Sequence, residues 1–160
     1  MQVQFINDKD FIRYKFKTKP YKHQYDAFLK SKDKDSYALF MEQGTGKSKV
    51  IIDNIAYLYR NGKIDTAIIA APKGVYRNWL SSEFKTHMPD DVKEFSDVII
   101  WSPNETKINV DNLVNFLKPS HKLKLFIVNI EALSTDKGKN YLHRLLNSSK
   151  AFFCIDESTN

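Results

Sequence analysis

The residues of this chain that are best suited to chemistry fall into two groups. Residues 44–48 read Gly-Thr-Gly-Lys-Ser, and Asp156 and Glu157 follow an apolar run near the other end. Glycines let the backbone turn so that its N–H groups face an anion, and a lysine at a helix start adds positive charge. A glycine loop of this kind together with a carboxylate pair predicts phosphate chemistry on a nucleotide.

Each residue of the glycine loop has an expected role. The candidate phosphate-binding residues are Gln43, Gly44, Thr45, Gly46, Lys47 and Ser48. Lys47 would reach the β- and γ-phosphates of ATP, and the Ser48 hydroxyl would hold Mg²⁺. The full loop pattern also asks for glycine at position 42, where this chain has Glu42. The alternative is a glycine turn that only caps a helix.

The stretches on either side of the loop favour the phosphate site. Residues 36–40 are short, mostly apolar and β-prone, and apolar residues recur at helical spacing from Val50 to Tyr59. A strand, a glycine turn and a helix are the order that a phosphate-binding loop requires. We therefore expect a strand over 36–40 and a helix that opens at Lys47 and Ser48.

The carboxylate pair also has a favourable context. Residues 151–155, Ala-Phe-Phe-Cys-Ile, predict an apolar strand that carries Asp156 and Glu157 at its carboxyl end. Asp156 would bind Mg²⁺ through water, and Glu157 would polarise the attacking water. An Asp-Glu pair without this context would be ordinary surface charge. The single cysteine, Cys154, excludes an internal disulfide, and we expect it to be a small core residue.

Strands and helices alternate along most of the chain. Further strands are predicted at 66–71, 98–101 and 125–130, and helices at 75–84, 113–117 and 139–146. This alternation favours a parallel α/β sheet, which binds ligands beyond the carboxyl ends of its strands. Trp79 lies on the apolar stripe of the helix at 75–84, so we expect it in the core. Residues 3–6 and 11–17 instead predict a hairpin or an edge strand.

Other candidate ligand-binding residues flank these elements. Gln24 precedes a helix upstream of the loop, and its amide offers a donor and an acceptor, as the edge of adenine does. Tyr21 could stack on the base or pack in the core. Lys73 and Arg77 follow the strand at 66–71, where they could bind a phosphodiester backbone, although isolated basic residues are commonly solvated surface.

Composition limits the class of protein. A chain of 160 residues, 42% of them hydrophobic, suffices for one domain with a single core. The net charge of +6 favours an anionic partner such as nucleic acid, or else reflects a lysine-rich solvated surface. No apolar stretch has the length of a membrane span, and residues 1–10 lack the pattern of a signal peptide. We expect a cytoplasmic protein without a membrane partner.

These motifs, in this order, resemble the first RecA-like domain of superfamily-two helicases. The most similar group is the Swi/Snf-type DNA translocases, including their compact phage forms. Residues 41–48 resemble motif I of that group, which also lacks the first glycine. Residues 20–24 resemble the adenine-reading motif, and residues 72–84 resemble motif Ia. Residues 129–131 resemble motif Ib, and residues 156–159 resemble motif II.

The resemblance implies a P-loop RecA-like three-layer α/β sandwich with a mainly parallel central sheet. It implies ATP and Mg²⁺ as cofactors and nucleic acid, with DNA favoured, as the partner. The implied catalytic residues are Lys47, Asp156 and Glu157, and the implied metal-holding residues are Ser48 and Asp156. The resemblance also implies that Tyr21 and Gln24 bind the base. The implied nucleic-acid contacts are Lys73, Arg77 and Asn78. A phage member would act in the host cytoplasm.

Two departures from the group's pattern bear on the organisation of the chain. Motif II usually ends in histidine, and Thr159 stands there. Motif III and a second RecA-like lobe with its arginine finger would follow Asn160. In this fold the strand after motif II lies between the phosphate-loop strand and the motif II strand, so we expect a sheet that is incomplete at the C-terminus.

We therefore expect an N-terminal strand and adenine-motif segment at 1–35 and a first RecA-like domain, truncated after motif II, at 36–160. As the front of a longer protein, the fragment alone would be nearly inactive as an ATPase. The alternative is a non-catalytic single lobe that binds ATP or DNA. A small-molecule kinase explains less, because neither a lid nor a substrate pocket is found.

Overall fold

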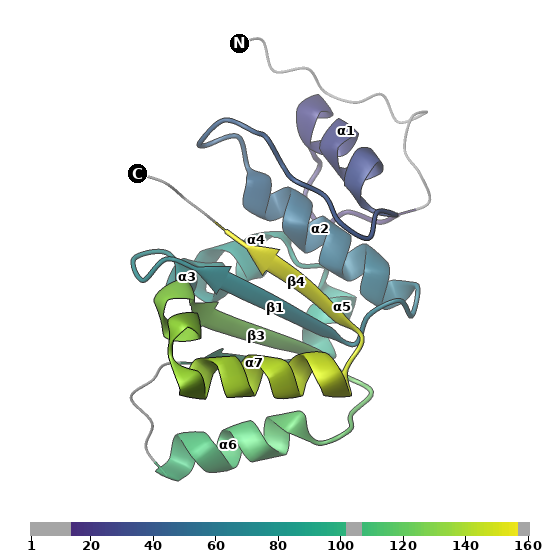
Figure 1. Cartoon of the computed structure of the whole chain (residues 1–160). Helices are drawn as coiled ribbons and strands as arrows, with labels where there is room; N and C mark the ends of the chain where they lie inside the picture. Colours follow the sequence, from purple (N-terminus) through teal and green to yellow (C-terminus); the bar gives the residue numbers. More distant parts are fainter. Residues whose placement is uncertain (1–13, 102–106, 157–160) are drawn as a thin grey trace.

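A computed structural model describes residues 14–101 and 107–156. Its centre is a four-stranded, all-parallel sheet with the order β2-β3-β1-β4 (Figure 1). The strands are β1 (Thr66–Ala71), β2 (Ser96–Trp101), β3 (Leu123–Asn129) and β4 (Ala151–Ile155). The four strands predicted from residue 66 onward are thus confirmed, as is the parallel α/β sheet.

The two faces of the sheet bury two separate cores. In β1, Ala67 and Ile69 face one core, and Ile68 and Ala70 face the other, because successive side chains point to opposite sides of a strand. Figure 1 shows α6 and α7 together on one side of the sheet and α2 on the other. The result is the expected three-layer α/β arrangement of the RecA-like fold.

Helices connect the strands. Their bounds are α1 (Lys22–Ser31), α2 (Lys47–Arg60), α3 (Tyr76–Asn78), α4 (Lys85–His87), α5 (Asp90–Glu94), α6 (Lys107–Leu117) and α7 (Asp136–Ser148). A π-helix, η2 (Trp79–Phe84), joins α3 to α4, and a 3₁₀ turn, η3 (Ile130–Ser134), follows β3. The predicted helices are confirmed, except that the one at 75–84 changes to π-helical spacing at Trp79.

Residues 36–40 do not form the predicted strand. This segment has no strand partner, and Phe40 is 96% exposed. The segment and β4 instead line a groove of about 830 Å³. A strand needs the N–H and C=O groups of a neighbour, so the β-propensity of these residues is not sufficient to form one.

The predicted N-terminal hairpin is also wrong where it can be compared. Residues 1–13 lie outside the described part of the chain, and residues 14–17 are not a strand. Tyr14 and Phe16 instead pack on Phe28 of α1, each with ring centroids 5.3 Å apart. The alternating aromatic residues therefore reflect packing on a helix and not a strand pattern.

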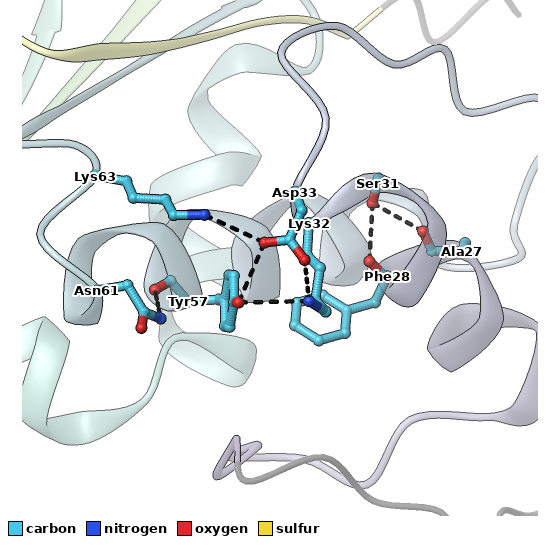
Figure 2. Close-up of polar contacts among 8 residues, drawn as sticks. All are labelled: Ala27, Phe28, Ser31, Lys32, Asp33, Tyr57, Asn61 and Lys63. Carbon is cyan, nitrogen blue, oxygen red and sulfur yellow. Dashed lines mark hydrogen bonds and ion pairs between the residues drawn. The ribbon is translucent and has the colours of Figure 1, made fainter.

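A polar network holds the end of α1 against α2 (Figure 2). Asp33 Oδ1 accepts hydrogen bonds from the Tyr57 hydroxyl and from Lys63 Nζ, both at 3.2 Å, and its other oxygen pairs with Lys32 Nζ. Tyr57 lies on α2, whereas Lys32 and Asp33 follow α1. This network and the aromatic contacts fix α1 on α2, and α1 carries Gln24 toward the glycine loop.

A buried ion pair lies within α2. Lys49 Nζ contacts Asp53 Oδ2 at 2.8 Å, and the two residues are 3% and 1% exposed. Burial raises the pKa of Asp53 to about 6, although the charge of Lys49 opposes this shift. Asp53 therefore depends on Lys49 for its ionised form in the folded chain.

Candidate functional site

Residues 42–46 form a tight turn in front of α2. The backbone N–H and the hydroxyl of Thr45 both donate to the carbonyl of Glu42, at 3.4 and 2.5 Å. Gly44 and Gly46 have φ angles of +77° and +81°, the left-handed region that favours glycine. Gly46 is the N-cap of α2, so the helix begins at Lys47, as predicted.

The start of α2 has the donors that a phosphate group needs. Lys47 Nζ donates to the carbonyl of Met41 at 3.0 Å, across the base of the loop. An ammonium group has three N–H donors, so this contact leaves capacity for phosphate oxygens. Ser48 lies in the first helical turn, where unpaired backbone N–H groups and the helix dipole favour an anion.

Two side chains of α1 hold the loop. Gln24 Nε2 donates to the carbonyl of Thr45 at 3.1 Å, and His23 Nε2 contacts the same oxygen at 3.0 Å. Gln24 Oε1 accepts from the backbone N–H of Tyr21 at 3.0 Å. An amide has two N–H donors and two acceptor lone pairs, and these bonds use one of each. Adenine recognition by Gln24 thus stays a prediction, with the residue placed beside the loop.

The other residues of this region are placed as follows. Tyr21 is 41% exposed and stacks on His23 with ring centroids 5.9 Å apart, so the alternative that it packs in the core is wrong. Gln43 lies exposed at the loop tip. His23 was not a candidate in the sequence, because a single histidine carries no spacing signal.

We predict that Gly46→Ala destabilises the chain more than Gly44→Ala. A Cβ at Gly46 would lie 2.2 Å from Gln24 Nε2, whereas one at Gly44 meets nothing within 4 Å. The left-handed backbone costs alanine about 1–2 kcal/mol at either position. Gly44→Ala therefore controls for strain alone, and the larger loss at Gly46 measures the packing of Gln24 on the loop. Urea denaturation is the measurement, and equal losses would contradict this account.

Asp156 is fixed at the carboxyl end of β4. Its backbone N–H donates to the carbonyl of Ala70 in β1 at 2.8 Å, and its Oδ2 accepts from Trp79 Nε1 at 3.0 Å. Trp79 is 1% exposed, so the prediction that it lies in the core is confirmed. Burial, and then the charge of Asp156, raise the pKa of Glu83 on the same helical segment. The predicted catalytic Glu157 lies outside the described residues.

Cys154 lies on β4 two residues before Asp156. Burial, and then the charge of Asp156, raise the pKa of its thiol to about 12. The thiol is therefore protonated and unreactive at neutral pH, in line with the small packing residue that the sequence predicts.

Lys47 and the carboxylate of Asp156 lie in one groove. Lys47 and Asp156 both line the groove of about 830 Å³ between residues 36–40 and β4. They are far apart in the sequence, and the fold brings them to one groove because β4 ends near the start of α2 (Figure 1). This juxtaposition is what a site for a nucleoside triphosphate requires.

A family model described as the type III restriction enzyme, res subunit, matches residues 12–158. This range includes the glycine loop, Asp156 and Glu157. The chain belongs to this family. Membership indicates a helicase-like ATPase domain that acts on nucleic acid, and the all-parallel sheet agrees with the RecA-like P-loop fold. No curated protein matches the chain in sequence.

Helicase-like domains of this kind generally use ATP with Mg²⁺, and this chain has a donor set that fits the metal. The described residues contain no cluster of three His, Cys, Asp or Glu side chains that could hold a metal ion alone. Mg²⁺ does not need one, because it keeps several waters and takes phosphate oxygens as ligands. A metal that arrives with the nucleotide would therefore need few protein ligands, and the assignment of Ser48 and Asp156 to Mg²⁺ stays a prediction.

The predicted nucleic-acid residues follow β1 at the carboxyl edge of the sheet. Lys73, Arg77 and Asn78 are exposed. The Arg77 guanidinium lies over the ring of Tyr76, 5.5 Å from its centroid, and its Nε donates to the Tyr76 hydroxyl at 3.2 Å. Tyr76 thus orients Arg77 at this edge. None of the helices in the described ranges is long and apolar enough to cross a membrane.

Proposed function

We propose that this chain is the ATP-binding lobe of a DNA-dependent ATPase, a helicase or double-stranded DNA translocase of the Swi/Snf type. The observation that carries the proposal is the shared groove of Lys47 and Asp156. The direct test is binding of a non-hydrolysable ATP analogue with Mg²⁺. Wild-type chain should bind it through Lys47, and a chain that binds DNA but no nucleotide would refute the proposal.

In this proposal each loop residue acts on a defined part of the nucleotide. Lys47 binds the β- and γ-phosphates, and the backbone of residues 43–46 surrounds them. Ser48 and Asp156 hold Mg²⁺, Asp156 through water, and Glu157 polarises the attacking water. The adenine lies on the α1 side of the loop, where Gln24 binds its edge and Tyr21 stacks on its face.

Hydrolysis at a full rate further requires a cation opposite Lys47. We propose that an arginine of a second RecA-like lobe supplies it, as the Swi/Snf resemblance implies. Such an arginine is worth about 10³–10⁵ in rate, so the isolated 160-residue chain would bind nucleotide but turn it over slowly. The alternative function, a non-catalytic module, would leave hydrolysis unchanged when a second lobe is present.

We predict that Arg77→Glu weakens binding to all nucleic-acid sequences alike. Arg77 is exposed at the carboxyl edge of the sheet and would contact phosphates, which carry no sequence information. Loss of one phosphate contact should lower the slope of log affinity against log salt by about 1. Fluorescence anisotropy with labelled duplexes of different sequence, at several salt concentrations, measures both quantities.

Lys93→Glu is the matched control for Arg77→Glu. Lys93 is also exposed, but it lies on α5, which precedes β2 and therefore lies at the amino end of the sheet. The same charge change there should alter binding little. Equal effects of the two variants would mean that only the net charge matters, and a sequence preference that survives high salt would also contradict the assignment.

A further inference from the structure

The contact between Trp79 and Asp156 joins an apolar core to the candidate metal side of the groove. Trp79 Nε1 donates to Asp156 Oδ2 at 3.0 Å, although the two residues are 77 positions apart. An indole N–H can only donate, and a bond to a carboxylate is about twice as strong as one between neutral groups. Trp79 is 1% exposed, so the donor side of this bond is shielded from water, whereas Asp156 is half-buried on the groove side.

The local backbone places Trp79 at this position. Trp79–Phe84 is a π-helix, a rare form that occurs frequently at functional sites. Its spacing of five residues brings Trp79 and Phe84 onto one side, and their ring centroids lie 5.9 Å apart. Phe84 is 3% exposed, so the indole is packed firmly and its N–H direction is fixed.

Asp156 needs such a donor because it shares its surroundings with a second carboxylate. Glu83 lies on the same π-helix, close enough for the charge of Asp156 to act on it. Two neighbouring carboxylates repel each other, and without a fixed donor the Asp156 side chain could rotate away from Glu83. The indole bond occupies Oδ2 and thereby leaves Oδ1 for a water of hydrated Mg²⁺.

We propose that Trp79 is a positioning residue that holds the Asp156 carboxylate for the hydrated Mg²⁺ of a bound nucleotide. The proposal rests on the proposed function, in which Asp156 acts on that metal. It assigns to Trp79 a polar role in addition to its place in the core. Trp79 does not touch the nucleotide and acts only through Asp156.

The test uses Trp79→Phe, which keeps an aromatic ring and removes the N–H donor. Trp101→Phe is the matched control, because Trp101 is 4% exposed and lies in the core on the other face of the sheet. Calorimetry with a non-hydrolysable ATP analogue is carried out over a series of Mg²⁺ concentrations and in EDTA. We expect Trp79→Phe to raise the Mg²⁺ concentration needed for half-maximal binding by about 10-fold or more, as for other residues that orient metal ligands.

Binding in EDTA should be the same for wild type, Trp79→Phe and Trp101→Phe, since the metal is absent there. If Trp79→Phe lowers the free energy of unfolding but keeps the wild-type Mg²⁺ dependence, the role of Trp79 is structural and the inference is wrong. That outcome leaves the proposed function intact. Failure of the wild type to bind the Mg²⁺ analogue would instead overturn the proposed function and this inference together.

A second measurement needs no substitution at Trp79. In ¹H–¹⁵N spectra of the wild type, the indole N–H signal of Trp79 should move when Mg²⁺ and the analogue are added, and also in Asp156→Asn. The signal of Trp101 serves as the internal reference and should stay in place. A Trp79 signal that is unchanged in both experiments would overturn the inference, even if Trp79→Phe does not fold.

Discussion

Lys47→Ala should reduce the affinity for ATP analogues by about 10²–10⁴ and leave the fold unchanged. Lys47 would make charge-assisted hydrogen bonds to two phosphates, each worth about 1.5–3 kcal/mol, and a loss of 1.4 kcal/mol is about tenfold. Among the residues that the structure describes, the half-buried lysine contributes to the fold only through its bond to Met41. The circular dichroism spectrum and the urea midpoint should therefore match those of the wild type.

Lys34→Ala is the control for Lys47→Ala. Lys34 also lines the groove and is exposed, so its loss removes the same charge from the same groove. It does not lie at the start of α2, and we expect it to change affinity little. Equal calorimetric affinities for wild type and Lys47→Ala would show that the glycine turn only caps the helix, which is the alternative that the sequence leaves open.

Lys49→Met should cost the largest share of stability, about 3–5 kcal/mol of the free energy of unfolding. The substitution leaves Asp53 buried without its partner, and removal of one member of a buried ion pair has this typical cost. Lys49→Met combined with Asp53→Leu should recover most of the loss, because an apolar pair of similar volume replaces the buried charges. Urea denaturation of the three proteins gives the comparison.

The loss should also depend on pH. Burial raises the pKa of Asp53 from 3.8 to about 6, so the folded chain binds this proton more readily than the unfolded chain. Ionisation of Asp53 therefore opposes folding, and its contribution to stability is highest below about pH 4 and falls as the pH rises through 6. Without Lys49 this fall becomes larger, so the cost of Lys49→Met should be smallest near pH 4 and largest above pH 7.

The exposed pair of Lys22 and Asp26 on α1 is the matched control. It has the same spacing of four residues, and its N–O distance is 2.7 Å against 2.8 Å in the buried pair. Both of its side chains are about half exposed. Lys22→Met should change the free energy of unfolding by only about 0.3–0.5 kcal/mol. Similar losses in the free energy of unfolding for Lys22→Met and Lys49→Met would show that burial does not determine how much an ion pair contributes to stability.

The sequence predicted β1 and β4 best, and both have the bounds that their apolar runs indicate. β1 lies inside the parallel sheet and is buried along its whole length, as a strand covered on both faces requires. β4 is an edge strand and leaves Phe153 and Ile155 exposed, which its apolar run does not reveal. The start of α2 was equally clear, since Gly46 and Lys47 mark it by backbone freedom and charge. These features depend on local sequence.

The features that the sequence missed depend on distant partners. Residues 36–40 have strand propensity but no backbone neighbour, and no property of the segment itself reveals this. The Trp79–Asp156 bond joins segments whose separation hides the contact. The apolar residues from Val75 to Phe84 predict a helix, but they do not reveal the π-helical spacing that places Trp79 and Phe84 on one side. His23 gains its role only because α1 packs beside the loop.

The π-helix at Trp79–Phe84 amounts to one extra residue in an otherwise regular helix from Tyr76 to His87. Deletion of one residue within it, such as Ser82, would restore α-helical spacing. The segment before the deletion would then turn by about 100° relative to the segment after it, because each residue of an α-helix advances by that angle. Phe84 could keep its place in the core only if Trp79 turned away from Asp156. The number of residues in this helix is therefore fixed by the contact between Trp79 and Asp156. Related chains that keep the contact should tolerate substitutions at exposed Ser81 and Ser82 but no insertion or deletion.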